Sequence, residues 1–246
     1  MKARAILLTS GGLLLAGLGA AVLAARPRRL TTTSTAPLGN DNLLHLGDRD
    51  VPIIFTAEIP SILLTSSFLT EDECSTLIEL ARPRLERSMV ISPVDGASVV
   101  HGARSSEGAS LPRGAAPAIE ARLAALTGSP VEHGEGLQIL RYLPGEEYRA
   151  HVDYFSDAAG DRLQLARGGQ RVATVLLYLN DVEAGGHTAF PEASLSVAPV
   201  KGSALLFRYL DASNRPDPRS LHAGLPVERG EKWVAAWWVR QGRYSA

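Results

Sequence analysis

Hydrophobic positions follow three different patterns that divide the chain into three parts. Residues 5–25 form an uncharged run of 21 residues, which as a helix measures roughly 30 Å, the thickness of a bilayer core. The polar, turn-rich stretch 31–50 is typical of a linker. Short helical and strand-like patterns fill the rest. We therefore expect an N-terminal signal anchor or transmembrane segment over residues 1–30, a linker over 31–50 and one folded domain over 51–246.

Two helices are predicted early in the domain. Thr70 and Glu73 have the spacing of a capping box, in which a hydroxyl and a carboxylate each satisfy a free backbone amide. Apolar residues then recur at helical spacing as far as Pro83. A second amphipathic helix is expected from about Ala116 to Leu126, with Gly128 just past its end.

Strands dominate the second half of the domain. Val51–Leu64 is apolar but contains two prolines, so we expect an edge strand there at best. Between residues 137 and 240 the chain has short β-prone runs separated by turn signals: LQILRYL, EYRAHVDYF, RVATVLLYL, HTAF, SALLFRYL, SLHAGLPV and KWVAAWWV. Such a series favours a sandwich or barrel. The expected fold class is α+β, with helices packed outside a jelly-roll-like β core and one hydrophobic N-terminal helix before it.

Composition excludes several classes of protein. The 25 basic and 26 acidic residues give a formal charge of −1, so a nucleic-acid partner held by phosphate contacts is not expected. Hydrophobic residues at 45% and charged residues at 21% exclude disorder for most of the chain. Cys74 is the single cysteine, so no intrachain disulfide can form, and we expect it to be a small core residue.

The N-terminal run permits three interpretations. Its length favours a retained signal anchor, while a cleaved signal peptide and an organelle transit segment remain alternatives. Residues 1–40 contain five basic and no acidic residues, and the basic ones flank the apolar run on both sides. The distribution of basic residues therefore does not predict which end of this run would face the cytoplasm.

Three side chains suggest a metal site. His151 and Asp153 are two residues apart in a predicted strand, so both point to one face. Alone this pair is a weak signal, and a hydrogen-bonded surface pair is the alternative. His222 in a later strand adds a second imidazole. Two imidazoles and one carboxylate leave open positions on an octahedral ion, which suits a non-haem Fe(II) that binds a cosubstrate and O₂.

Lys232 is the next candidate. Only three of the 25 basic residues are lysines, and a compact ammonium suits an ion pair with a cosubstrate carboxylate in a narrow barrel. A solvated turn lysine is the alternative interpretation.

These residues lie within a longer ordered pattern. It comprises FLTEDECSTLIELARPRL, the SSEG segment, IEARLAALTGSPVEHGEGLQILRYLPGEEYRAHVDYF, GGQRVATVLLYLNDVEAGGHTAFPEA, VAPVKGSALLF and SLHAGLPVERGEKWVAAWWVR. Over residues 56–240 the chain resembles the plant and algal type of prolyl 4-hydroxylase, a branch of the Fe(II)- and 2-oxoglutarate-dependent dioxygenases.

The resemblance implies a double-stranded β-helix with specific site residues. In that family's pattern His151, Asp153 and His222 hold Fe(II), and Lys232 pairs with the far carboxylate of 2-oxoglutarate. Further cosubstrate contacts are implied for Tyr142 and Thr174, and Trp238 lies where the family lines the site. The implied cofactors are Fe(II), 2-oxoglutarate as cosubstrate, O₂ and ascorbate.

Two positions depart from the family's pattern. His187 stands where an acidic residue is common, and we interpret it as a rim residue that does not bind metal. Leu225 replaces a cysteine that is frequent in plant relatives.

The loop from Asp211 to Ser220 is expected near the mouth of the site, where it can influence substrate choice.

The expected activity is hydroxylation of peptidyl proline at C4 with release of succinate and CO₂. Its substrate is a Pro-rich polypeptide, because polyproline II segments lack internal hydrogen bonds and can enter a groove. The alternatives are the same oxygenase chemistry on another substrate and a catalytically silent β-barrel module that binds Pro-rich chains. We expect a single-pass protein of the endoplasmic reticulum membrane with a lumenal catalytic domain; a Golgi or secreted protein is the alternative.

Overall fold

The structure, a computed structural model, describes residues 42–88, 90–91, 98–99, 104–156, 158–211, 213 and 215–245. The expected N-terminal hydrophobic helix lies outside these residues. Within the described ranges, none of the helices combines the length and the apolar character needed to cross a bilayer.

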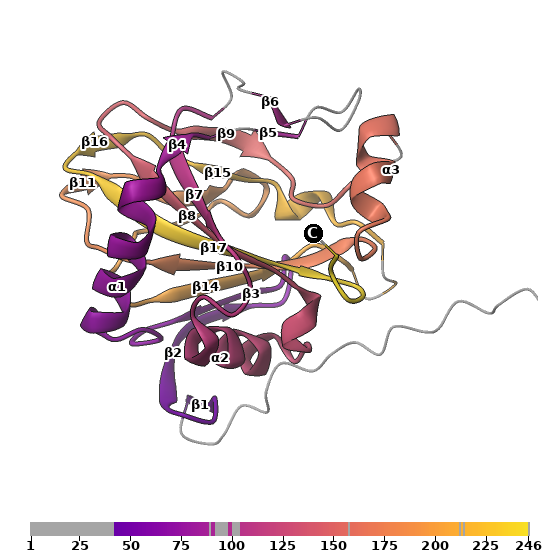
Figure 1. The fold of residues 1–246 in the computed structure, drawn as a ribbon, viewed down its shortest axis with the longest axis horizontal. Coiled ribbons are helices and arrows are strands. Elements are labelled where there is room, and N and C mark those ends of the chain that lie inside the picture. Colours follow the sequence, from indigo (N-terminus) through magenta and orange to yellow (C-terminus); the bar gives the residue numbers. More distant parts are fainter. Residues whose placement is uncertain are drawn as a thin grey trace, which may run out of the picture. The chain divides into compact units, whose positions relative to one another are not determined.

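A nine-stranded antiparallel sheet forms the main layer of the domain (Figure 1). Two of its central strands, RVATVLLY and KWVAAWWVR, are rich in the β-branched and aromatic residues that favour strands. In spatial order the strands are β1 (Leu43–His45), β2 (Asp50–Ala57), β3 (Ile62–Thr65), β14 (Ala204–Arg208), β10 (Arg171–Tyr178), β17 (Lys232–Arg240), β8 (Gly134–Tyr142), β7 (Glu107–Leu111) and β4 (Glu86–Arg87).

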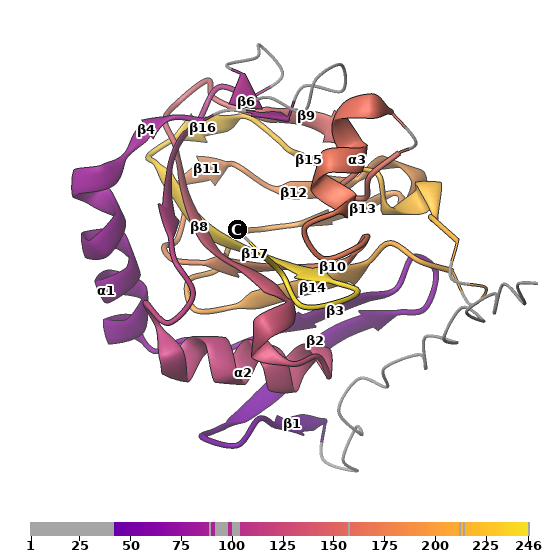
Figure 2. The same ribbon diagram turned by 45° about the vertical axis from the view of Figure 1, so that its right-hand side comes forward.

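A smaller four-stranded sheet lies opposite strands β8, β17 and β10 (Figure 2). Its order is β13 (Leu195–Val197), β12 (Thr188–Phe190), β15 (His222–Gly224) and β9 (Tyr148–His151). Two strand pairs complete the described β structure: β11 (Ala184–Gly185) with β16 (Val227–Arg229), and β5 (Val90–Ile91) with β6 (Ser98–Val99). Two facing antiparallel sheets make the core mostly β and of the jelly-roll type.

Few helices accompany the sheets. Helix α1 (Glu71–Ala81) begins at a capping box, in which the Thr70 hydroxyl accepts the Glu73 N–H and the Glu73 carboxylate accepts the Thr70 N–H. Helix α2 (Pro117–Thr127) ends at Gly128, whose φ of +66° favours glycine. Both predicted helices are therefore confirmed. The other helices are α3 (Ala159–Leu165) and the 3₁₀ turns η1 (Arg82–Arg84), η2 (Val131–His133), η3 (Pro191–Ala193) and η4 (Pro218–Ser220).

Alternation along the strands separates two hydrophobic cores. On β14, Leu206 packs with the helix-side core, which includes Cys74 and Leu123 from α1 and α2. Leu205 and Phe207, pointing the other way, pack with residues of the small sheet in the core between the sheets. Cys74 is fully buried, and burial raises the pKa of its thiol to about 11. The space between the two sheets is where the predicted site residues meet.

The beginning of the domain differs from the sequence-based expectation. Strand β1 falls within the stretch 31–50 that was assigned to a linker, and Leu44 and Leu46 are buried in the helix-side core. Packed structure therefore begins before residue 51. The apolar segment Val51–Leu64 contributes two strands rather than one edge strand, since β2 lies between β1 and β3.

Candidate active site

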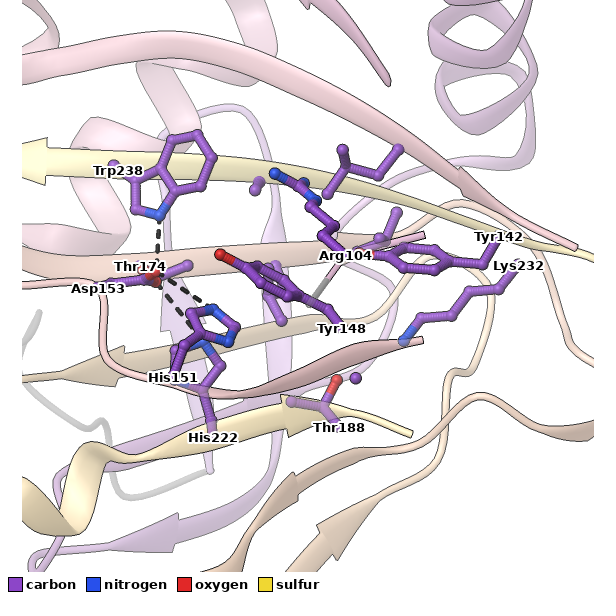
Figure 3. A pocket seen from close by; sticks show the side chains of 15 residues that line it. Arg104, Tyr142, Tyr148, His151, Asp153, Thr174, Thr188, His222, Lys232 and Trp238 are labelled. Carbon is purple, nitrogen blue, oxygen red and sulfur yellow. Dashed lines mark hydrogen bonds and ion pairs between the residues drawn. The ribbon is translucent and has the colours of Figure 1, made fainter. Parts of the chain in front are cut away.

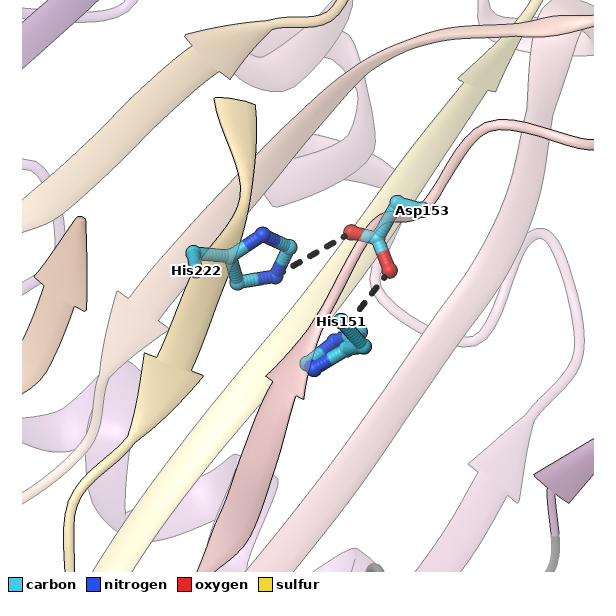
Figure 4. A group of neighbouring side chains, drawn as sticks. All are labelled: His151, Asp153 and His222. Atoms are coloured by element: carbon cyan, nitrogen blue, oxygen red, sulfur yellow. Dashed lines mark ion pairs between the residues drawn. The ribbon is translucent and has the colours of Figure 1, made fainter. Parts of the chain in front are cut away.

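Two strands of the small sheet bring the predicted metal ligands together. His151 is the last residue of β9 and His222 the first of β15, and the two are paired across the antiparallel register. Asp153 follows two residues after His151, just beyond the strand rather than inside it. One ligand atom from each of the three lies within 4.8 Å of the others (Figure 4). These residues form a His-Asp-His triad that is able to bind a metal ion.

Backbone carbonyls orient both imidazoles of the triad. His151 Nδ1 lies 2.8 Å from the Arg149 carbonyl, and His222 Nδ1 lies 3.0 Å from the Ser220 carbonyl. A carbonyl only accepts, so in each neutral ring Nδ1 carries the proton and Nε2 presents a lone pair. The two Nε2 atoms face Asp153, at 3.5 Å for His151 and 3.6 Å for His222. Both rings thus present the nitrogen that binds metals.

The protonation states of His222 and Asp153 suit the same role. Burial, with a smaller effect from His151, lowers the pKa of His222 to about 4, so at neutral pH this imidazole is free to ligate. Burial alone would raise the pKa of Asp153, but His222 and His151 hold it well below its usual range. At neutral pH His222 and Asp153 can therefore bind a metal ion without first losing a proton.

The donor set tests whether iron fits. Two imidazole nitrogens and one carboxylate are the ligands of the facial triad of non-haem Fe(II) oxygenases, and a sulfur ligand is absent from this group. The residues therefore fit the ferrous ion that the sequence analysis assigned to them.

The ionised carboxylate of Asp153 is held by donors from the main sheet. Its Oδ2 accepts a hydrogen bond from the Thr174 hydroxyl of β10 at 2.6 Å and from the Trp238 indole of β17 at 3.1 Å. Thr174 and Trp238 are themselves cross-strand partners. Two of the residues that the sequence analysis named as site contacts thus reach the triad directly.

Lys232 lies in the same pocket as the triad (Figure 3). It is 4% exposed, which excludes the alternative of a solvated turn lysine. Its Nζ donates to the Gly186 carbonyl at 2.6 Å and lies 5.6 Å from the centre of the Tyr142 ring. Gly186 has a φ of +67°, a conformation that costs glycine little. Among the described residues no carboxylate forms an ion pair with Lys232, and burial lowers its pKa to about 8.

Tyr142 completes the Lys232 end of the pocket. It is the register partner of Lys232 in the β8–β17 pairing. Thr188 also lines the pocket, and its hydroxyl accepts a hydrogen bond at 2.8 Å from Tyr178, which lies behind the lining residues. A buried cation flanked by phenol and hydroxyl groups, in one pocket with the triad, is a receptor for a small dicarboxylate.

A wider groove opens beside this pocket. The two cavities share Arg104, Tyr148, Asp153 and Trp238, and the groove continues along residues of β7, β8 and α3. The Tyr148 ring stacks on His151 with a centroid distance of 3.6 Å, and the Arg104 guanidinium lies over the Tyr148 ring at 4.8 Å. Tyr148 therefore stands at the junction between the groove and the triad.

Four residues of the site were not singled out from the sequence: Arg104, Tyr148 and Thr188, which line the pocket, and Tyr209, whose hydroxyl lies 3.3 Å from Asp153 Oδ2. Tyr148 was detectable, because it begins the strand that ends in His151. Thr188 directly follows His187, the residue to which the sequence drew attention. Arg104 and Tyr209 reach the site through tertiary packing and carry no local signal.

The remaining predicted positions lie outside the triad. The metal-binding group contains His151, Asp153 and His222 but not His187, and the His187 carbonyl accepts the Leu225 N–H at 2.8 Å. Leu225 is 39% exposed. In the 211–220 loop, the described residues that line a separate surface cavity are Asp211, Arg215, Pro216, Asp217, Pro218 and Arg219.

Comparison with known proteins places this site in a family. The model of the 2OG-Fe(II) oxygenase superfamily matches residues 137–240, which include the whole triad and Lys232. Probable prolyl 4-hydroxylase 10 of Arabidopsis thaliana is 42% identical over 208 residues, covering 76% of this chain and 71% of the relative. Prolyl 4-hydroxylase 2 of the same plant is 42% identical over 204 residues, covering 73% of this chain and 67% of the relative.

A solved structure agrees with these relatives. The viral collagen prolyl hydroxylase of Paramecium bursaria Chlorella virus-1, in its 2OG complex, is 29% identical with a TM-score of 0.55. The match covers 73% of this chain and 95% of that chain. The resemblance inferred from the sequence motifs is confirmed, and the chain belongs to the prolyl 4-hydroxylase family of the Fe(II)- and 2-oxoglutarate-dependent dioxygenases.

Proposed function

We propose that this protein hydroxylates C4 of prolyl residues in a polypeptide, consuming 2-oxoglutarate and O₂ and releasing succinate and CO₂. The observation that carries the proposal is one pocket that joins the His-Asp-His triad to the buried, carboxylate-free ammonium of Lys232. A catalytically silent binding module has no need of such a pair.

The triad residues are assigned to the metal. His151 and His222 offer Nε2, and Asp153 offers its carboxylate. When bound, iron supplies the activation of O₂ and the oxidation of the prolyl C–H bond, coupled to decarboxylation of the cosubstrate. The chain's own residues orient the ligands through Arg149, Ser220 and the donors to Asp153.

Four further residues are assigned to 2-oxoglutarate. Lys232 pairs with the carboxylate far from the metal, and Tyr142 lies beside it as a further contact. Thr174 and Trp238 line the pocket at the Asp153 end, where both donate to the Asp153 carboxylate and are assigned as further contacts of the cosubstrate. Low exposure at Lys232 strengthens its ion pair, because a buried pair is poorly screened.

The substrate assignment rests on the groove and on the relatives. The Arabidopsis relatives are named prolyl 4-hydroxylases, and the viral structure is named a collagen prolyl hydroxylase. An extended Pro-rich segment has free backbone carbonyls and exposed rings. The groove is lined by the aromatic side chains of Tyr148 and Trp238 and by the cation of Arg104, which such a chain would contact.

Ascorbate and the cellular location are part of the same proposal. Ascorbate serves as the reductant that restores Fe(II) after turnovers without substrate. The uncharged run 5–25 supports anchorage in the endoplasmic reticulum membrane by a hydrophobic N-terminal helix, with the catalytic domain in the lumen. A Golgi protein and a protein secreted after signal cleavage are the alternatives. Protease protection of the tagged full chain in sealed microsomes, compared with the chain lacking residues 1–30, tests the anchor and its orientation.

Product analysis tests the reaction. The purified full chain is incubated with Fe(II), 2-oxoglutarate, ascorbate and a Pro-rich peptide, and the peptide is hydrolysed for amino-acid analysis. We expect 4-hydroxyproline. Oxidation of another residue would retain the oxygenase and reject the prolyl substrate.

A further inference from the structure

Tyr209 is a buried phenol beside the triad, and the assignments above do not use it. It directly follows β14 and is 0% exposed. Its backbone N–H donates to the Val172 carbonyl at 3.3 Å, and its ring packs edge-on against Phe207 at a centroid distance of 5.9 Å. Phe207 in turn lies 4.5 Å from the His222 ring. The phenol is therefore fixed in place between the sheets.

The Tyr209 hydroxyl has two polar neighbours. It is hydrogen-bonded to the Thr174 hydroxyl and lies 3.3 Å from Asp153 Oδ2. The Thr174 hydroxyl, in turn, lies 2.6 Å from the same Oδ2.

Counting protons determines the direction of these hydrogen bonds. Each hydroxyl has one hydrogen, and the ionised Asp153 carboxylate can only accept. Thr174 donates its hydrogen to Oδ2, the shorter contact, so its oxygen is the acceptor in the bond with Tyr209. The single phenolic hydrogen is therefore directed at the Thr174 oxygen and, over a longer distance of 3.3 Å, at Asp153 Oδ2 itself, which gives the relay Tyr209 to Thr174 to Asp153 with a weaker direct contact beside it. Hydrogen bonds in such a chain strengthen one another.

We propose that Tyr209 is a positioning residue for the metal ligand Asp153. Through the relay it holds the Thr174 hydrogen on Oδ2, which also accepts the Trp238 indole. Oδ2 lies 3.6 Å from His222 Nε2, and the other oxygen, Oδ1, lies 3.5 Å from His151 Nε2 and accepts none of these three hydrogen bonds. Asp153 then offers one free oxygen to the ion, and the positions needed by 2-oxoglutarate and O₂ stay open. This inference rests on the proposed assignment of the triad to a metal.

Metal affinity tests the inference without turnover. Co(II) is titrated into the metal-free full chain in the absence of 2-oxoglutarate, and the visible absorption of the bound ion is recorded. Removing a partner that orients a metal ligand costs about 10- to 100-fold in affinity. Tyr209→Phe, which removes only the hydroxyl, is expected to weaken Co(II) binding about tenfold and to alter the absorption bands. His222→Ala, measured in parallel, identifies the triad as the site.

Tyr178→Phe is the matched control. Tyr178 is also fully buried in the core between the sheets, but its hydroxyl donates to Thr188 and not to Asp153. Its removal leaves a comparable hole and is expected to leave Co(II) affinity unchanged. A loss shared by both variants would mean that packing alone is responsible and would overturn the positioning role.

Variants of Thr174 keep the inference testable if Tyr209→Phe does not fold. Thr174→Val breaks the relay and is expected to weaken Co(II) binding, whereas Thr174→Ser keeps the hydroxyl and restores affinity. Equal affinities for these two variants would overturn the relay. If Tyr209→Phe folds and binds Co(II) with wild-type affinity, the role of Tyr209 is overturned while the metal assignment stands. Equal binding by wild type and His222→Ala would overturn the metal assignment as well.

Discussion

His222 and His151 are paired directly across the antiparallel β15–β9 register, although 71 residues separate them in the chain. Their ring centroids lie 4.3 Å apart. A register slip of one residue would turn one ring to the opposite face of the sheet. The geometry of the metal site therefore depends on the register between strands β15 and β9 of the small sheet.

Replacing His222 by alanine should abolish metal binding and turnover in a folded protein. The change removes one of three ligands and leaves a small cavity between the sheets. We expect Fe(II) affinity to fall by about 100-fold or more, beyond the range for residues that only orient a ligand. Calorimetric titration with Mn(II) and an assay of succinate release provide the measurements. His187→Ala is the control and should retain affinity within about twofold; normal turnover by His222→Ala would remove this residue from the site.

Replacing Lys232 by alanine should raise the KM for 2-oxoglutarate. A cosubstrate carboxylate buried without its partner loses about 2 to 5 kcal/mol, so we expect an increase of at least about tenfold, with metal affinity retained. Lys201→Ala removes a surface lysine paired with Glu71 at 3.8 Å and should leave the KM unaltered. An unchanged KM in Lys232→Ala would disprove the ion pair.

The affinity for 2-oxoglutarate should fall in alkaline solution. Burial lowers the pKa of Lys232 to about 8, and a bound carboxylate favours the ammonium and so raises that pKa. Between these two pKa values the free protein must take up a proton to bind, so Kd should rise about tenfold per pH unit. Below about pH 8 the ammonium is already formed and this dependence disappears. Calorimetry with Mn(II)-loaded protein across this range is the measurement; a constant Kd from about pH 7 to 9.5 would contradict the proposal.

Replacing Arg122 by alanine should destabilise the fold. Arg122 on α2 is 1% exposed and donates to Asp48, to Glu73 at 2.8 Å and to the Phe68 carbonyl at 2.7 Å. Its partners Asp48 and Glu73 are 44% and 22% exposed, so water partly replaces the lost cation, and losing these charged hydrogen bonds costs about 2 kcal/mol or more. Urea denaturation measures this loss.

An exposed ion pair provides the control for Arg122. Arg215→Ala breaks the pair with Asp211 on the surface and should cost less than about 1 kcal/mol. Equal losses in the two variants would show that the Arg122 network contributes no more than a surface pair.

Local patterns were sufficient for much of the fold. The capping box at Thr70 and Glu73 determines where α1 begins, because its two hydrogen bonds involve residues three apart. Strand runs such as RVATVLLYL coincide with β10 to within one residue. Leu44 and Leu46 were missed, because the three leucines in residues 43–46, set among polar residues, carry too little pattern to distinguish a short strand from a linker.

Tertiary register was not predictable from the same patterns. Alternation shows that Phe207 and Tyr209 share a face, but not that the β10–β14 pairing puts Phe207 opposite Thr174. That pairing brings the Tyr209 phenol to Asp153. Asp153 itself lies beyond β9, so its convergence on the histidines depends on the turn after the strand. Residue type and order identified the candidate ligands, and strand pairing determined their neighbours.

The coupling between cosubstrate and peptide oxidation tests the central claim most directly. The full chain is supplied with Fe(II), 2-oxoglutarate, ascorbate and a Pro-rich peptide, and succinate and 4-hydroxyproline are measured in the same reaction. The account predicts that the two products form in equal amounts and that both disappear in His222→Ala. Bound iron and a folded protein that yields neither product would contradict it.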